Sequence, residues 1–198
     1  LTPSPAWQQV TRTFTVPDHA VKMTVLHLIR SVGSLTTDDF ALSDIGIGSF
    51  AQGMISLHFD DGMESVYTNA IPLLQSAGIK SSQYVITQDF GDDGYVSLPQ
   101  VLTMRLMGHE IGSHSRTHAH LTQITPAALH NEIFGSKSDL ALIGTSAETF
   151  VYPYGEFNDV VRQTVIDAGY RGARSVRTGF NTIHTDAFSL LDQHVESN

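Results

Sequence analysis

Along the first 45 residues, hydrophobic and polar positions alternate with the period of β-strands. In VTRTFTV, residues 10–16, the side chains of Val10, Phe14 and Val16 fall on one face. Two further β-rich runs follow, KMTVLHLI at residues 22–29 and LTTDDFAL at residues 35–42. Because a period of two residues is typical of strands with one buried face, residues 1–45 are expected to form an all-β segment.

After a glycine-rich linker at residues 46–53, short apolar runs alternate with longer segments that carry helix signals. Ser97 and Gln100 suit a capping box, Pro126 suits a first helical turn, and Asn158 suits an N-cap. The expected strands are residues 54–59, 81–86, 109–114, 149–154 and 170–176, and the expected helices are residues 64–77, 98–107, 126–143 and 158–168. This alternation predicts an α/β fold with a parallel sheet, open or closed into a barrel.

Composition and charge narrow the classes of partner. Of the 198 residues 41% are hydrophobic, which is enough for a sizeable core, and the net charge is −9 with only 11 Lys plus Arg. A nucleic-acid backbone or an anionic membrane is therefore not expected as the main partner. No apolar run approaches the roughly 18 residues that span a bilayer, and the start, LTPSPAW, lacks the features of a signal peptide. The absence of cysteine excludes disulfides, thiolate zinc sites and a cysteine nucleophile.

Two adjacent carboxylates, Asp60 and Asp61, follow the first expected strand of the α/β part. In parallel sheets the chemistry lies at the C-terminal ends of strands, so this pair stands where a ligand would bind. An ordinary turn is the competing interpretation, because the chain contains two other Asp pairs, at residues 38–39 and 92–93. The pair alone is weak evidence for function.

Two histidines four residues apart, His114 and His118, lie at the end of another expected strand, at the same edge of the sheet. Two neutral imidazoles and one carboxylate make a three-ligand site with an open position, the arrangement of a catalytic metal that activates water. One aspartate would then bind the cation while its neighbour accepts a proton. Two histidines and a carboxylate also describe the iron site of oxygenases, but that alternative leaves the second aspartate without a task.

A third segment, FVYPYGEFN at residues 150–158, combines Pro153 and Gly155 in a turn after a strand. Such a turn would present Tyr154 and its backbone N–H at the same edge of the sheet. An ordinary strand-to-helix loop is the alternative.

Together these segments resemble the polysaccharide deacetylase family, the NodB-homology enzymes of carbohydrate esterase family four. The family's first motif corresponds to His58–Gly62, its second to His114–His118 and its third to Tyr152–Gly155. The resemblance implies a distorted (β/α) barrel over residues 54–198, in which Asp61, His114 and His118 hold a divalent metal. Zn²⁺ suits this ligand set best, although Co²⁺ or Ni²⁺ could bind similarly. It also implies that Asp60 is the general base and that the Tyr154 backbone helps to hold the oxyanion. Residues 1–45 resemble the end of a carbohydrate-binding β-sandwich.

Two departures from the family pattern stand out. The third motif often begins with Arg, which orients the base, and here Val151 takes that place; Arg174, on the next expected strand, could supply the charge. The family's late Leu-x-His motif, whose His acts as the general acid, is not matched, because Leu191 and His194 have a different spacing. The C-terminal strands are therefore expected to be missing, or a partner chain to complete the barrel.

The resemblance implies a secreted or cell-surface bacterial hydrolase that removes acetyl groups from N-acetylglucosamine polymers such as chitin, peptidoglycan or poly-N-acetylglucosamine. Tyr152, Pro153 and Arg174 are the expected substrate contacts. An acetylxylan esterase and a non-catalytic glycan-binding protein are the alternatives. An N-terminal β segment separated from its own sandwich also predicts a homo-oligomer or strand exchange between chains.

Overall fold

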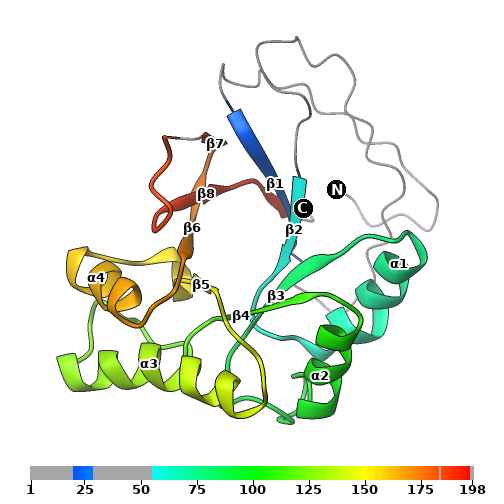
Figure 1. Ribbon diagram of the computed structural model, residues 1–198, viewed down its shortest axis with the longest axis horizontal. Helices are drawn as coiled ribbons and strands as arrows, with labels where there is room; N and C mark the ends of the chain where they lie inside the picture. Colours follow the sequence, from blue (N-terminus) through cyan, green and yellow to red (C-terminus); the bar gives the residue numbers. More distant parts are fainter. Residues whose placement is uncertain (1–19, 29–54, 183, 197–198) are drawn as a thin grey trace.

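The computed structural model describes residues 20–28, 55–182 and 184–196, and in these ranges the backbone forms one curved sheet with helices outside it (Figure 1). Six of its strands run in parallel order, and each pairs with the next: β1 Ala20–Leu28, β2 Ile55–Phe59, β3 Ser81–Val85, β4 Glu110–Ser113, β5 Thr149–Val151 and β6 Gly172–Thr178. All six overlap segments predicted to be strands: β2 to β6 overlap the five strands expected in the α/β part, and β1 overlaps the β-rich run at residues 22–29.

The last strands return the sheet to its beginning. β8, Leu190–Asp192, pairs in parallel with β6, and β9, His194–Glu196, pairs in parallel with β1. A two-residue strand, β7 Asn181–Thr182, adds an antiparallel pairing to the start of β1. Because β8 and β9 follow each other in the chain, they connect the two ends of the sheet, as the red segment in Figure 1 shows. The predicted fold class, a distorted (β/α) barrel, is confirmed, and strands of the same chain join its two ends.

The strand β1 comes from the stretch that the sequence assigned to a separate all-β segment. It pairs with β2 from Met23 to Leu26, so this strand is continuous with the sheet of the α/β part. The other strands expected in residues 1–45, at 10–16 and 35–42, lie outside the described residues, and the likeness of residues 1–45 to a carbohydrate-binding module stays a prediction.

The four predicted helices form, and local signals explain their ends. α2, Leu98–Leu106, begins with the Ser97–Gln100 capping box, and the Thr125 hydroxyl accepts from the Ala128 N–H at the start of α3, Pro126–Leu142. The Asn158 side chain accepts from Val161 N–H at the start of α4, Asp159–Asp167. The first helix is irregular: a π-helical turn, Val66–Ala70, precedes α1, Ile71–Ser76. Pro72 has no N–H to donate, which removes an α-helical hydrogen bond there.

The core lies between the helices and the sheet, and it fixes the strands whose ends carry the site. Val85, Phe150 and Val151 of the sheet are fully buried, as are Ile133 and Leu140 of α3. Large-to-small changes at such positions typically cost about 2–5 kcal/mol, so the strand ends have little freedom to shift. Within the part of the chain that the structure describes, no helix is both long enough and apolar enough to cross a bilayer.

The expected strand at residues 149–154 is shorter than predicted. β5 ends at Val151, and Pro153–Gly155 form a 3₁₀ turn in which Tyr154 has a φ of 57°. A Cβ added at Gly155, whose φ is +69°, would lie 2.3 Å from Val176 Cγ2 and 2.8 Å from the Val176 amide nitrogen. The turn therefore packs directly on β6, and only glycine leaves room for that contact.

Candidate metal centre and adjacent carboxylate

Three segments that follow β2, β4 and β5 converge at the C-terminal edge of the sheet. Asp61 comes after β2, and His114 comes directly after β4. The Asp61 Oδ1 atom lies 3.4 Å from His114 Nε2 and 3.6 Å from His118 Nε2, and the two Nε2 atoms are 3.2 Å apart. The structure thus brings together the three residues that the sequence singled out as metal ligands.

The imidazole of His114 is held in one orientation by the backbone. The Nδ1–H group donates to the Val151 carbonyl oxygen at 2.8 Å, and the side chain is only 4% exposed. Because a carbonyl oxygen can only accept, Nδ1 carries the proton and the Nε2 lone pair faces Asp61 and His118. A hydrogen bond of this kind, which sets the tautomer and the ring angle, accompanies most histidine ligands of metals.

The donor set fits a divalent cation. Burial, followed by the neighbouring His114, lowers the pKa of His118, so the His118 imidazole can offer a lone pair at neutral pH. Two such lone pairs and a carboxylate oxygen directed at one point repel one another unless a positive charge lies between them. Two nitrogens and one oxygen are ligands typical of Zn²⁺, with further positions left open for water or substrate.

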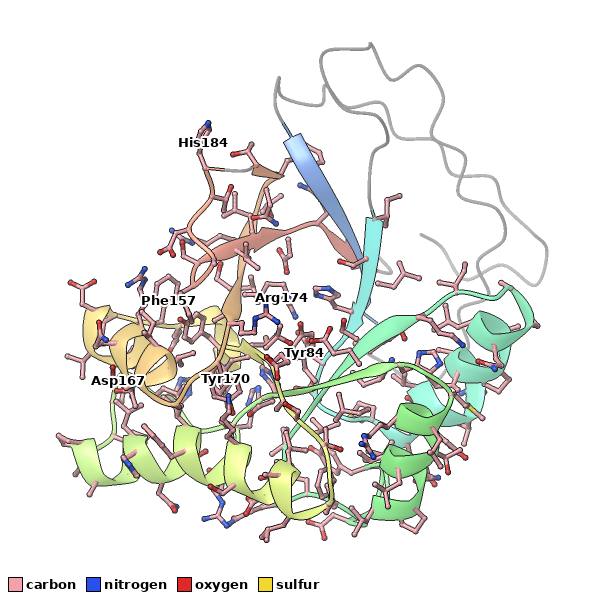
Figure 2. The ribbon with its side chains drawn as sticks, viewed as in Figure 1. Tyr84, Phe157, Asp167, Tyr170, Arg174 and His184 are labelled. Carbon is pink, nitrogen blue, oxygen red and sulfur yellow. The ribbon has the colours of Figure 1, made fainter. Side chains whose placement is uncertain are left out.

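Asp60, beside this cluster, is bound on its other side by a buried arginine. Arg174 Nη2 donates to both carboxylate oxygens of Asp60 at 2.5 Å, and Nη1 donates to the fully buried Asp192 of β8 at 3.0 Å. In Figure 2 the Arg174 side chain extends from β6 into the barrel toward Tyr84. Burial raises the pKa of Asp60, but Arg174, with His114 and His58, outweighs it and lowers the pKa below its usual value. Asp60 is therefore a carboxylate at neutral pH.

Left-handed backbone conformations mark the same segments. Among the described residues, four that are not glycine have positive φ: Asp61 at 69°, Ser115 at 65°, His118 at 56° and Tyr154 at 57°. Each conformation costs of order 1 kcal/mol or more outside glycine and persists only where the surroundings hold it. Two of the four residues are candidate ligands, so the local strain coincides with the candidate cation site.

Three residues expected to contact a substrate are instead inside the protein. Tyr152 is fully buried, and its hydroxyl donates to the Phe188 carbonyl oxygen at 3.0 Å; Pro153 is buried beside it. Arg174 is 2% exposed and is engaged by Asp60 and Asp192. Burial leaves these three side chains little accessible surface, and their contact with substrate stays a prediction.

Tyr154 is the aromatic residue that does face outward at this edge. It is 49% exposed, and its ring contacts His118 at 4.5 Å between centroids and stacks on His120 at 3.9 Å. His120 in turn pairs with Glu156 at 3.0 Å. A hollow of about 530 Å³ opens next to this group, with Glu156, Phe157, Asn158 and Arg177 in its wall.

Sequence reasoning missed Asp192 and the carbonyl of Val151. Asp192 stands in a short strand that was not predicted, and its role depends on contact with Arg174, 18 residues away in sequence. The Val151 carbonyl carries no side-chain signal at all. His194, considered for the late histidine of the family, lies in β9, and its side chain is outside the described part of the chain.

Comparison with known proteins places these features in a family context. A family model described as polysaccharide deacetylase matches residues 48–173, which contain all three segments of the site. A gellan lyase of a Bacillus species is 33% identical over 148 residues, 73% of this chain and 6% of that protein. A peptidoglycan-N-acetylglucosamine deacetylase of Bacillus cereus is 29% identical over 119 residues, 60% of this chain and 54% of that protein.

Among solved structures, the deacetylase PplD of Streptococcus pyogenes in complex with acetate is similar, with a TM-score of 0.71 and 26% identity. The match covers 73% of this chain and 66% of PplD. The matched part of the chain spans about half of the length of the curated relatives, or much less in the case of the gellan lyase.

Proposed function

This chain belongs to the polysaccharide deacetylase family, and from that membership and the geometry of the site we propose that it is a metal-dependent hydrolase. Its substrate is an acetylated polysaccharide with N-acetylglucosamine units, such as chitin, peptidoglycan or poly-N-acetylglucosamine, and its products are acetate and a free amine. The observation that carries this proposal is the Asp60 carboxylate, paired with Arg174, next to Asp61, whose side chain converges with those of His114 and His118.

Asp61, His114 and His118 would hold the cation, for which Zn²⁺ is the first candidate and Co²⁺ or Ni²⁺ are alternatives. When bound there, a divalent cation supplies Lewis-acid activation of a water molecule and polarisation of the acetyl carbonyl. His114 is oriented for this task by the Val151 carbonyl, and the lowered pKa of His118 keeps its nitrogen free of a proton.

Asp60 acts as the general base. It accepts a proton from the water whose oxygen bonds to the acetyl carbon. In the later step the C–N bond breaks to give acetate, and the nitrogen gains one proton as it leaves as the free amine, which balances the proton taken up by Asp60. Arg174 keeps Asp60 ionised before the reaction and fixes its orientation through both oxygens. The Tyr154 backbone N–H is the proposed donor to the oxyanion, and the turn at Pro153–Gly155 sets its position.

Polymeric substrates suit the surface beside the site. The exposed Tyr154 ring borders the candidate metal ligands, and the hollow next to it extends along Phe157 and Arg177. A sugar ring can lie on an aromatic face, and a neighbouring unit of the same chain can enter the hollow. We place the acetylated unit at the ligand cluster and the next unit in this hollow.

Secretion or display on the cell surface of a bacterium is part of the proposal, because polymers of this kind lie outside the cytoplasm. Nucleic acid is not a proposed partner, since the chain has a net charge of −9. Exchange of N-terminal strands between copies remains the hypothesis for self-association. Light scattering tests it, and a strict monomer at high concentration would remove it.

The proposal is tested by acetate release from N-acetylglucosamine oligomers, measured before chelation, after chelation and after Zn²⁺ is restored. We expect release to stop with chelator and to recover with Zn²⁺, because water is not activated without the cation. Acetylated xylan and N-acetylglucosamine oligomers are compared in parallel. Binding of oligomers without acetate above background would instead identify a glycan-binding protein.

Replacement of Arg174 by Met is expected to shift the pH dependence of the reaction. Burial raises the pKa of Asp60 and Arg174 lowers it, so without the guanidinium the pKa of Asp60 rises. The acid limb of the kcat/KM profile then moves to higher pH, and activity is lost first on the acidic side. The variant is also expected to lose about 3–5 kcal/mol of stability, since Asp60 and Asp192 lose their shared partner.

The matched control is Arg171→Met, because Arg171 is an exposed arginine that directly precedes the same strand. Its acid limb should coincide with that of the wild type. An Arg174→Met profile with an unshifted acid limb would show that Arg174 does not tune Asp60.

A further inference from the structure

The segment that joins the two candidate histidine ligands leaves the sheet and lies against α3. Residues Ser115 and His118 in this segment both have positive φ, at 65° and 56°. A segment with this backbone needs support from outside itself, because non-glycine residues do not favour the left-handed region. The backbone conformation of this segment determines whether the Nε2 atoms of His114 and His118 point at the same place.

A single buried carboxylate on α3, that of Glu132, supplies three hydrogen bonds of this support. Its Oε2 atom accepts the backbone N–H of Arg116 at 3.0 Å and that of Thr117 at 2.9 Å. Its Oε1 atom accepts the Thr117 hydroxyl at 2.7 Å. Glu132 is only 6% exposed, and all three hydrogen bonds go to the segment between the two imidazoles.

Other residues of α3 also contact this segment, through the side chain of Arg116. Arg116 Nε donates to Asp139 Oδ2 at 2.9 Å, and Arg116 Nη1 donates to Asn131 Oδ1 at 2.9 Å. A Cβ added at Gly135 would lie 2.5 Å from Arg116 Cδ, so the Arg116 side chain runs directly over the helix backbone. Residues 132, 135 and 139 share one face of a helix, because they are three and four positions apart.

The other side of the segment is tied to the end of β3. The Thr87 N–H donates to the Ser115 carbonyl oxygen at 3.2 Å, and the Gln88 N–H donates to the Arg116 carbonyl oxygen at 3.0 Å. The Ser115 hydroxyl oxygen accepts the His118 N–H at 3.0 Å. These hydrogen bonds fix the position of the segment relative to the sheet, and Glu132 fixes its position relative to α3.

We propose that Glu132 is a positioning residue for cation binding: by holding the amides of Arg116 and Thr117, it sets the separation of the His114 and His118 nitrogens. This inference rests on the proposed function, because it assumes that these histidines bind a cation. Glu132 does not touch the cation cluster in the contacts described, so its effect passes through the backbone. Outer hydrogen-bond partners of metal ligands typically contribute 10–100-fold to metal affinity.

The test is calorimetric titration of the metal-free full chain with Zn²⁺, in the wild type and in Glu132→Ala. We expect the Kd for Zn²⁺ to weaken about 10–100-fold in Glu132→Ala. Glu132→Gln is expected to retain much of the affinity, because an amide oxygen can still accept both N–H groups and the Thr117 hydroxyl can then accept from the amide nitrogen. Such a rescue separates local geometry from a general loss of packing.

Leu140→Ala serves as the control for destabilisation. Leu140 is fully buried on the same helix, and its side chain belongs to the hydrophobic core. We expect its thermal midpoint without Zn²⁺ to fall and its Kd for Zn²⁺ to stay at the wild-type value. If Glu132→Ala does not fold, Glu132→Leu takes its place in the same titration, because leucine fills much of the same space but cannot accept the two N–H groups, and the same weakening is expected.

Two results are distinguishable. If the wild type does not bind Zn²⁺, the proposed metal-dependent function fails. If the wild type binds Zn²⁺ and Glu132→Ala binds it equally well, or if Leu140→Ala weakens binding as much, the role assigned to Glu132 is wrong while the proposed function stands.

Discussion

Replacement of Asp60 by Asn is expected to reduce acetate release from N-acetylglucosamine oligomers by about 10²–10⁴-fold, the range that a general base contributes. Asn cannot accept a proton, whereas its amide oxygen can still accept from Arg174. The cation ligands Asp61, His114 and His118 are untouched, so Zn²⁺ binding measured by calorimetry should be unchanged. Loss of turnover with retained cation is the signature of a missing base.

Asp93→Asn is the matched control, because Asp93 is an exposed member of another Asp pair in the chain. It should leave both acetate release and Zn²⁺ affinity at the wild-type values. Near-normal acetate release by Asp60→Asn would assign the base to another group.

Replacement of His114 by Ala is expected to remove both Zn²⁺ binding and acetate release. The imidazole is buried, and Val151 and Asp61 hold its two nitrogens on either side. Its loss leaves two ligands, so the affinity should fall by more than the 10–100-fold caused by the loss of an outer partner. Calorimetry gives the affinity, and acetate release is measured with added Zn²⁺.

His184→Ala controls for the loss of an imidazole, because His184 is exposed and its side chain points away from the body of the protein in Figure 2. It should bind Zn²⁺ and release acetate as the wild type does. If His114→Ala kept wild-type Zn²⁺ affinity, the cation would have to bind elsewhere.

The position of the site could be predicted because it depends on local sequence and on one topological rule. Asp60 and Asp61 follow one predicted strand and His114 ends another, and parallel strands bring their C-terminal ends to one edge. Arg174 could also be anticipated, since Val151 occupies the place of the expected arginine and β6 lies next to β5. These inferences needed only the order of the strands.

Contacts between distant segments could not be predicted in the same way. Asp192 reaches Arg174 from β8, and Glu132 reaches the histidine segment from α3, each through a buried carboxylate with no sequence signal of its own. The burial of Tyr152 could not be predicted, because an aromatic residue beside a functional turn suits a core as well as a sugar. Burial, which decides between these roles, is a property of the packed molecule.

The two strands that connect the ends of the sheet could not be predicted from the sequence pattern either. β8 and β9 are three residues each, too short for a period of two to be recognised. Their pairing with β6 and β1 was therefore found only in the structure. It supplies both Asp192 and a connection between the last and first strands of the barrel.

The central claim is that Asp61, His114 and His118 bind one divalent cation, whereas the neighbouring Asp60 is not a ligand of that cation. Anomalous diffraction at the zinc edge, from crystals of the chain grown with Zn²⁺, tests it most directly. The account predicts one peak at about 2.0–2.2 Å from both His Nε2 atoms and an Asp61 oxygen, with Asp60 outside that distance and still bound to Arg174. A peak elsewhere, or one in which Asp60 replaces Asp61 as the ligand, would contradict it.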